Sequence, residues 1–431
     1  MQSKCVIIGG GLSGLSAGVY LAQAGLKVEL FESSPKLGGR AYSFRENGDI
    51  IDNGQHIMMG CYRETLSFLR TIGTSDKLSI QERLKVDFIH RQKGPTPLKT
   101  GGSPYPINLI LALLSYKAIS FSERLEIIRL FSKLIFTRPD ENLTILQWLK
   151  KERQSPGTIK AFWEILSVGA LNTDISRASA SLFASILKEM FLKGNQAASI
   201  ILPRTGLSEL FCEDSARFIC KNGGSILMSH AVKEVEIKDN KIHKIILQGG
   251  REVTGFDFVI SAVPYYAFQR IFPEAFVQSM KMENISYSSI LSLNIWMKES
   301  PFTGEFFGLI DSPVQWVFKR RNYITIVISN ADAIVDKSKE DLEDLIISEL
   351  EEFFPDFKRN AVLRTRLIKE KRATFVPAPE VLKQRPGTRS PVKNLFLSGD
   401  WTQTDLPATI EGAVLSGRKA ALAILEYSGN S

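Results

Sequence analysis

Apolar and polar residues follow a strand-like pattern at the start of the chain and a helix-like pattern directly after it. Residues 5–8 are mainly apolar, which is typical of a buried strand in a parallel sheet. A helix is predicted from about residue 12 to residue 24, and a second strand over residues 27–31 ends at Glu32. The succession of strand, helix and strand predicts a parallel sheet with helices packed on its faces.

Helical periodicity dominates the middle of the chain, between residues 104 and 136. Ile127, Phe131 and Leu134 recur on one side of the predicted helix, while the charged side chains fall elsewhere on its surface. Such an apolar side fits either a protein core or the wall of an apolar tunnel. Further helices are predicted over residues 143–153, 159–171 and 180–191.

Strands return in the second half of the chain. Residues 231–237 and 241–247 alternate like the two strands of an antiparallel hairpin, and residues 256–264 predict a buried strand that returns to the main sheet. Between about residues 265 and 371 predicted strands and helices mix, as in an α+β domain. A last buried strand and a last helix are predicted at residues 394–400 and 408–427.

With 431 residues, of which 44% are hydrophobic, the chain has the size of two or three globular domains. Its four cysteines and four histidines are scattered, so we expect free thiols in a reducing compartment, with no disulfide and no metal site. The first residues lack the pattern of a cleavable signal, and the apolar run at 109–114 is far shorter than the about 20 residues of a membrane-spanning helix. We therefore expect a cytoplasmic protein.

The net charge of +8 is concentrated in one segment. Residues 81–160 contain 14 Lys and Arg against 7 Asp and Glu. Nucleic acid is not expected as a partner, because no basic and aromatic binding motif accompanies these charges. An anionic membrane surface fits better, since the same segment is rich in apolar residues, and the protein would then be peripheral on the cytoplasmic membrane face. A solvated basic face is the alternative.

A glycine-rich turn joins the first predicted strand to the first predicted helix. Gly9, Gly11 and Gly14 form the pattern Gly-x-Gly-x-x-Gly. The first glycine permits the tight turn, the second lets a pyrophosphate approach the backbone, and the third allows close packing of helix and strand. The helix start directs its N–H groups at the phosphates, and Glu32 can accept hydrogen bonds from ribose hydroxyls. This order predicts a dinucleotide site, and a purely structural glycine turn is the alternative.

Two polar loops follow this unit. Gly38-Gly39-Arg40 would bring the backbone and a guanidinium fork close to a phosphate, with a surface turn as the alternative. Residues 52–56, Asp-Asn-Gly-Gln-His, lie between apolar residues. They fit a turn that lines a cavity as well as they fit a hydrogen-bonded loop.

The N-terminal motifs, together with Gly399-Asp400 before the last helix, resemble those of the FAD-dependent amine oxidase and carotenoid desaturase superfamily. The resemblance implies an α/β fold, in which a Rossmann-like FAD-binding domain of the glutathione-reductase type carries an inserted α+β substrate domain with a helical subregion. The implied parts are a discontinuous FAD-binding domain at residues 1–85, 200–265 and 390–431, a mainly helical substrate or membrane-facing region at 86–199, and an α+β substrate domain at 266–389.

Six motifs in order along the chain are similar to those of the hydroxysqualene dehydroxylases, also called squalene-associated FAD-dependent desaturases. They begin at Asp52, Gly60, Leu171, Ala178, Leu202 and Gly399. One position departs from the family pattern, because Asp174 stands where a proline is expected. The departure affects the local turn.

The resemblance implies FAD as the cofactor, and no cysteine or histidine occupies an obvious attachment motif, so we expect it to be non-covalent. Asp400 would contact the ribityl and phosphate region, the last helix would point its N-terminus at the isoalloxazine, and the strand around Val232 would contact adenine. With the residues described above, the expected FAD contacts are Gly9, Gly11, Leu12, Ser13, Gly14, Glu32, Gly39, Arg40, Asn53, Gly54, Val232, Gly399, Asp400, Thr409 and Ile410.

The implied reaction is the reductive removal of an allylic hydroxyl from hydroxysqualene, giving squalene for hopanoid synthesis, with hydride from reduced flavin. The candidate proton donors are His56, Asp52, Asp174 and Glu411, of which His56 is the first choice. The expected partner is a long apolar prenyl substrate. Because no second Gly-x-Gly-x-x-Gly occurs, the electron donor is expected to be external. A phytoene-type carotenoid desaturase, a flavin amine oxidase and a non-enzymatic FAD-binding prenyl-lipid carrier are the alternatives.

Overall fold

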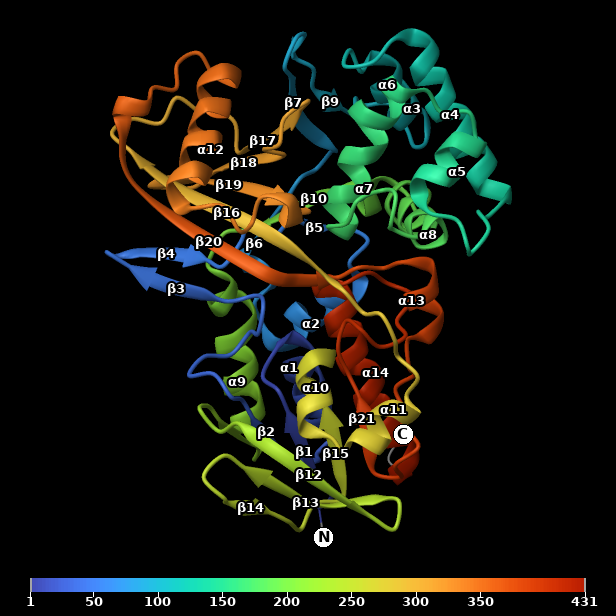
Figure 1. The fold of residues 1–431 in the computed structure, drawn as a ribbon, viewed down its shortest axis with the longest axis vertical. Coiled ribbons are helices and arrows are strands. Elements are labelled where there is room, and N and C mark those ends of the chain that lie inside the picture. The colour runs from blue at the N-terminus through green and yellow to red at the C-terminus, as the bar shows by residue number, and fades with distance from the viewer. Residues whose placement is uncertain (1, 430–431) are drawn as a thin grey trace.

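A five-stranded parallel sheet forms the lower half of the molecule in Figure 1, with the strand order β11-β2-β1-β15-β21. The computed structural model describes residues 2–429. The strands come from three distant parts of the chain: β1 (Lys4–Ile8), β2 (Lys27–Phe31), β11 (Ser225–Leu227), β15 (Phe258–Ser261) and β21 (Leu395–Leu397). The parallel sheet predicted from the first strands is therefore confirmed.

Successive residues of β1 point to opposite faces of this sheet, as the pleat of a strand requires. Cys5 and Ile7 belong to the core beneath three helices, whereas Val6 and Ile8 belong to a second core on the other face. The three helices are α1 (Leu12–Gln23), α9 (Glu213–Lys221) and α14 (Ile410–Ser428). The other face is covered by an antiparallel sheet and a short helix: β12 (Val232–Lys238), β13 (Lys241–Leu247), β14 (Glu252–Val253) and α10 (Tyr265–Ile271). The predicted hairpin is β12 and β13, so that prediction is also confirmed.

An eight-stranded mixed sheet crosses the upper half of the molecule (Figure 1). Its strands are β20 (Val362–Phe375), β16 (Tyr287–Met297), β19 (Tyr323–Ser329), β18 (Trp316–Lys319), β17 (Phe306–Ile310), β7 (Lys85–His90), β8 (Gly94–Pro95) and β9 (Leu98–Lys99). One face packs on α12 (Lys339–Phe353), where Leu293 meets the core around Ile346. The opposite face packs on the helical region through Phe306 and Val327.

The segment predicted to be mainly helical contributes β7, β8 and β9 to this sheet, and β7 pairs in parallel with β17. Its helices are α3 (Ile107–Ser115), α4 (Phe121–Phe136), α5 (Ile145–Lys151), α6 (Pro156–Thr158), α7 (Glu164–Leu171) and α8 (Ala180–Phe191), with a π-helical turn at Ile159–Trp163. The helical stretch predicted over 104–136 is thus two helices. A break at 116–120 separates them, and Ser120 starts α4 because its hydroxyl accepts from the backbone N–H of Glu123 in a capping box.

The remaining short elements lie between and beside the two sheets. They are β3 (Ser43–Glu46), β4 (Asp49–Asp52), β5 (Met58–Met59), α2 (Arg63–Ile72), β6 (Leu78–Ile80), β10 (Ile200–Pro203), α11 (Glu274–Ser279) and α13 (Pro379–Gln384), with short 3₁₀ or π turns at Ser75–Lys77, Asn195–Ala198, Ser208–Cys212, Ala331–Ala333 and Arg359–Ala361. Within residues 2–429, none of the helices combines the length and the apolar character that crossing a bilayer requires. The architecture confirms the α/β fold class, whereas the domain boundaries given above stay predictions.

Candidate functional site

The glycine-rich turn between β1 and α1 has two glycines with opposite surroundings. A Cβ atom on Gly14 would lie 2.0 Å from the carbonyl oxygen of Gly9, so Gly14 is what lets α1 pack against the turn. A Cβ atom on Gly11 would have only the Cα atom of Gly39 within 4 Å, at 3.9 Å. Gly11 therefore faces open space in front of the first turn of α1, where a helix N-terminus favours an anion.

That open space is one end of a cavity of about 790 Å³. All the FAD contacts expected from the sequence line this cavity except Gly14, which packs inside the turn. Its second end is mainly apolar and reaches α7 and the eight-stranded sheet. The lining residues at that end are Gly169, Ala170, Ile290, Trp316, Phe318 and Val327.

The carboxylate of Glu32 lies at the polar end, directly after β2. Its two oxygens accept hydrogen bonds from the backbone N–H groups of Gly10, at 2.6 Å, and Ser34, at 2.7 Å. Oε1 also accepts the Ser33 hydroxyl at 3.1 Å, so these bonds fix the orientation of the carboxylate and leave a second lone pair on Oε2 for a further donor. A buried carboxylate held in this way fits the hydroxyls of a ribose.

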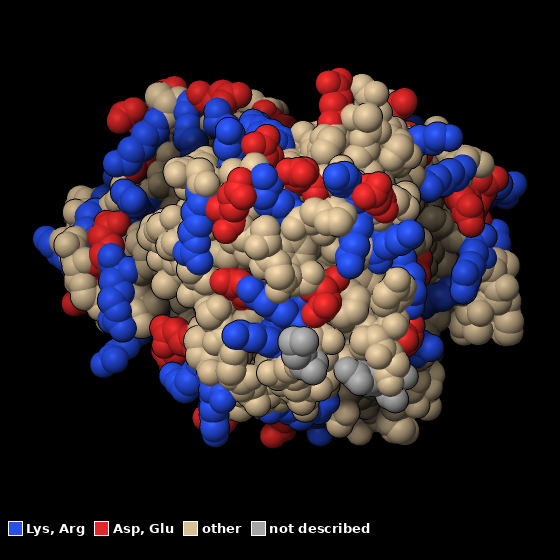
Figure 2. Space-filling view, turned by 90° about the horizontal axis from the view of Figure 1, so that it is seen from below, with Lys and Arg blue, Asp and Glu red and all other residues tan. Residues whose placement is uncertain are grey.

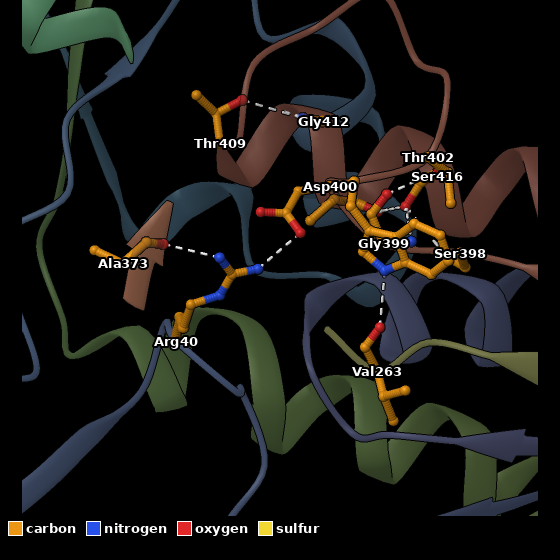
Figure 3. A network of polar contacts seen from close by, with 12 residues as sticks. Arg40, Val263, Ala373, Ser398, Gly399, Asp400, Thr402, Thr409, Gly412 and Ser416 are labelled. Carbon is orange, nitrogen blue, oxygen red and sulfur yellow. Dashed lines mark hydrogen bonds and ion pairs between the residues drawn. The ribbon is translucent and has the colours of Figure 1, made fainter. Parts of the chain in front are cut away.

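Arg40 and Asp400 form an ion pair across the cavity, although they are 360 positions apart in the chain. Figure 3 shows the guanidinium of Arg40 between the Asp400 carboxylate, at 2.8 Å, and the Ala373 carbonyl oxygen, also at 2.8 Å. The sequence predicted both residues as separate cofactor contacts. The structure adds that each orients the other, since the pair joins the Gly38–Arg40 loop to the turn before α14.

The N-terminus of α14 also lies at the cavity, where Thr409 and Ile410 line the wall. The hydroxyl of Thr409 accepts the backbone N–H of Gly412 at 3.2 Å, which caps the helix. Helix α14 itself holds the turn that precedes it, because the backbone N–H of Gly399 donates to the hydroxyl of Ser416 at 2.9 Å (Figure 3). The positive end of this helix is therefore held rigidly toward whatever the cavity binds.

Arg385 was not identified from the sequence, yet it holds this same turn. Its buried guanidinium donates to the carbonyl oxygens of Asp400 and Leu406, both at 2.8 Å, to that of Thr402, and to the Thr404 hydroxyl at 2.9 Å. Burial lowers the pKa of Arg385 to about 10, so it remains charged at neutral pH. No local motif marks Arg385, because its partners lie 15 to 21 residues further along the chain.

Two of the four candidate proton donors are engaged in structural contacts away from the cavity. Asp52 forms an ion pair with Arg320 at 2.8 Å and accepts the Leu207 backbone N–H at 3.0 Å. Glu411 accepts the backbone N–H of Thr65 at 2.8 Å and its hydroxyl at 2.6 Å, which anchors the start of α2. Burial raises the pKa of Glu411, and neither residue lines the cavity.

Asp174 is also outside the cavity, and its carboxylate accepts the backbone N–H of Ser176 at 2.8 Å in a local turn.

Among the four candidates the structure brings only His56 to the cavity wall. Its Nδ1 lies 2.8 Å from the carbonyl oxygen of Gly54. A carbonyl oxygen can only accept, so Nδ1 carries the hydrogen and Nε2 is the nitrogen left for a ligand. Burial lowers the pKa of His56, so the neutral imidazole dominates at neutral pH.

The cavity fits FAD on three observations from this chain. Gly11 leaves a cradle that a larger side chain would fill, the first turn of α1 offers N–H groups and a positive dipole end beside it, and the fixed carboxylate of Glu32 lies next to both. The residues present would thus hold pyrophosphate and ribose at one end, with the start of α14 facing the ring system at the other.

Comparisons with known proteins agree with this site. The model of the family described as flavin containing amine oxidoreductase matches residues 12–425. The chain is 30% identical to a hydroxysqualene dehydroxylase of Rhodopseudomonas palustris, over 98% of this chain and 99% of that protein. It is 25% identical to a 15-cis-phytoene desaturase of an Oncidium hybrid cultivar, over 98% of this chain and 78% of that protein. The solved structure of an oxidoreductase from Methanosarcina mazei has the same fold, with a TM-score of 0.77 at 19% identity over 98% of this chain and 100% of that one.

Proposed function

The chain belongs to the family of flavin-containing amine oxidoreductases and is an FAD-dependent oxidoreductase, and we propose that it reduces hydroxysqualene to squalene by removing the allylic hydroxyl. The observation that carries this proposal is the similarity to hydroxysqualene dehydroxylases along nearly the whole chain, which includes both ends of the cavity. The chemistry supplied by bound, reduced FAD is a hydride donated to an electron-poor carbon.

The apolar end of the cavity supports a hydrocarbon substrate. Trp316, Phe318 and Val327 from the eight-stranded sheet face Gly169 and Ala170 of α7 across this space. Such walls bind a long isoprenoid chain by removing its apolar surface from water, and they exclude water from the reacting carbon. At Gly169 the wall approaches the opposite side closely, because a Cβ atom there would lie 3.9 Å from the Trp316 ring.

The departing hydroxyl needs a proton, and we assign its delivery to His56. In the imidazolium form, Nε2–H can donate to the hydroxyl oxygen while Nδ1–H stays bonded to Gly54. The carbon–oxygen bond then breaks with its electron pair on oxygen, water leaves, and the allylic carbon accepts the hydride. The lowered pKa of His56 makes the imidazolium a stronger acid but a minor species at neutral pH.

An anaerobic assay tests the proposal. Purified holoenzyme is reduced chemically and mixed with hydroxysqualene, and the extract is analysed for squalene by mass spectrometry. Formation of squalene, with reoxidation of one flavin per product, is expected. A reduced flavin that stays reduced in the presence of hydroxysqualene contradicts the proposal, and it also leaves the lipid-carrier alternative standing.

A phytoene-type desaturase is the second candidate, because the similarity to a 15-cis-phytoene desaturase extends over the same 98% of this chain. Such an enzyme would use the same cavity, and oxidised FAD would there accept a hydride from the substrate. The oxidised enzyme mixed with phytoene in the absence of oxygen distinguishes the two, because oxygen would reoxidise the reduced flavin. Bleaching of the flavin by phytoene with formation of a longer conjugated product supports this second candidate over the first.

A further inference from the structure

Helices α3 and α4 expose an unusual number of apolar side chains. Of the twelve large hydrophobic side chains that are exposed within residues 2–429, seven lie on these two neighbouring helices. The seven side chains, which we call the α3–α4 face, are Ile107, Ile110, Leu111, Phe121, Leu125, Ile135 and Phe136. Phe136 is 86% exposed. Figure 1 shows both helices in the helical region at the upper right.

Large apolar side chains lie on the outer side of α4 as well as on the side that packs on the protein. Ile127, Leu130 and Leu134 are buried and fill the side that packs on the protein. At about 100° per residue, Phe121 and Leu125 project from the opposite side. A helix in a globular protein normally places polar residues there. The outer side of α4 therefore mixes large apolar side chains with the cations Arg129 and Lys133, as in a helix that lies at a boundary between apolar and polar surroundings.

The acidic and the basic side chains near the α3–α4 face have different surroundings. The two acidic residues of α4 turn inward, since Glu123 accepts the backbone N–H of Ser120 at 2.7 Å and Glu126 accepts that of Ser155 at 2.8 Å. The basic residues Lys117 and Arg138 lie exposed in the segments just before and just after α4. The face therefore presents apolar groups with cations beside them, and the two carboxylates of α4 are hydrogen-bonded to backbone groups of the protein.

The opposite end of the molecule has a different surface. Figure 2 shows that end from below, with Lys and Arg interspersed with Asp and Glu. The antiparallel sheet β12–β14 lies there (Figure 1), and its side chains include exposed Lys238 and Lys241. Lys244 on the same sheet pairs with Glu252 at 2.9 Å. A mixed surface of this kind is typical of solvated protein.

We propose that the α3–α4 face docks on the surface of a bilayer that contains anionic phospholipids. Apolar side chains of a helix lying in the interface enter the boundary between headgroups and acyl chains, while flanking cations meet the phosphates. Both features are present on this face, and a protein partner would not require the cations to stand beside the apolar groups. The inference rests on exposure and charge, so it is independent of the proposed substrate.

The docked face is also connected to the cavity wall. Helix α4 packs on α6, and the chain continues from α6 through residues 159–163 into α7, which carries Gly169 and Ala170 at the apolar end of the cavity. Leu130 of α4 and Trp163 belong to one buried cluster with Leu171 of α7. A bilayer at the α3–α4 face would thus lie behind the same helices that form the substrate wall.

Flotation of the holoenzyme with vesicles, without any substrate, tests the proposal. The vesicles contain phosphatidylcholine alone or phosphatidylcholine with phosphatidylglycerol, at low and high salt. The wild-type protein is expected to float with the anionic vesicles at low salt. The double variant Ile110→Ser/Phe136→Ser is expected to stay unbound. Removing two cations in Lys117→Ala/Arg138→Ala should weaken binding about 25-fold, because each basic residue near such a surface is worth roughly fivefold.

Matched controls carry the same kinds of change elsewhere. Leu363→Ser/Leu422→Ser removes two other exposed apolar side chains, and Lys238→Ala/Lys241→Ala removes two exposed cations of the β12–β14 sheet. Both controls should float like the wild type. The proposal is overturned if the wild type does not bind anionic vesicles at low salt, or if a control reduces binding as much as its partner variant. Self-association through this face would also overturn the proposal. The result would be a dimer in sedimentation that is lost in Ile110→Ser/Phe136→Ser, together with no binding of the wild type to vesicles.

Discussion

Replacing Gly11 by valine should abolish flavin binding while leaving the fold intact. Gly11 has φ −72° and ψ 177°, which any residue can adopt, so the backbone is not strained by a side chain. A Cβ atom there meets only the Cα of Gly39, at 3.9 Å. The two methyl groups of valine would therefore extend into the cavity, where the pyrophosphate must approach the turn.

The size of the loss follows from the contacts that valine prevents. A hydrogen bond from the backbone to a charged phosphate is worth about 1.5–3 kcal/mol. The start of α1 adds up to about 2 kcal/mol for an anion placed close to it. Losing both in full would cost about 3.5–5 kcal/mol, which is a roughly 300- to 4,000-fold weaker affinity for FAD.

Titration of the apoprotein with FAD, followed by quenching of flavin fluorescence, measures this affinity. The matched variant is Gly14→Ala, whose single methyl group would lie 2.0 Å from the Gly9 carbonyl oxygen. The Gly14 variant should lower the melting temperature of the apoprotein, whereas Gly11→Val should not. The reasoning is refuted if Gly11→Val binds FAD like the wild type, or if it destabilises the apoprotein as much as Gly14→Ala does.

Three further predictions concern single residues of the site. Glu32→Ala should weaken FAD binding by roughly 10- to 100-fold in the same titration, less than Gly11→Val, because it removes one charge-assisted ribose contact; unchanged affinity would place the ribose elsewhere. In the squalene assay, kcat/KM should fall as pH rises above the lowered pKa of His56, since only the imidazolium donates, and His56→Gln should remove this limb. A pH profile shared by both proteins would assign the proton to another group. Arg385→Met should lower the free energy of unfolding by about 3–5 kcal/mol, measured with denaturant, because the carbonyls of the turn at Asp400 lose their donors. A loss under about 1 kcal/mol would mean that water replaces the guanidinium.

The local parts of the fold and of the cofactor site could be predicted from the sequence. A buried strand, a glycine-rich turn and the helix after it are encoded within about 20 neighbouring residues, because side-chain periodicity and backbone sterics act over short distances. For this reason Gly9, Gly11 and Glu32 were found by spacing alone, and all three line the cavity. The hairpin of β12 and β13 was predictable on the same grounds.

Contacts between distant segments were decided by the tertiary structure. Arg40 and Asp400 each carried a motif, but their pairing depends on how β21 is placed beside β15. Arg385 carried no motif, since its ligands are backbone carbonyls of a turn that exists only in the folded chain. The strand β20 was missed as well, because it lies at the edge of its sheet and alternates charged residues with apolar ones of moderate burial.

The same division applies to the candidate chemistry. The sequence offered His56 as the first choice before three carboxylates, and packing supports this order. The carboxylates of Asp52 and Glu411 are satisfied by neighbours, while His56 keeps Nε2 for the cavity. The helices at 107–136 could be predicted from their periodicity, but periodicity does not tell which apolar residues find partners. Burial is a property of the assembled molecule, because a side chain is covered only when segments remote in the chain pack against it.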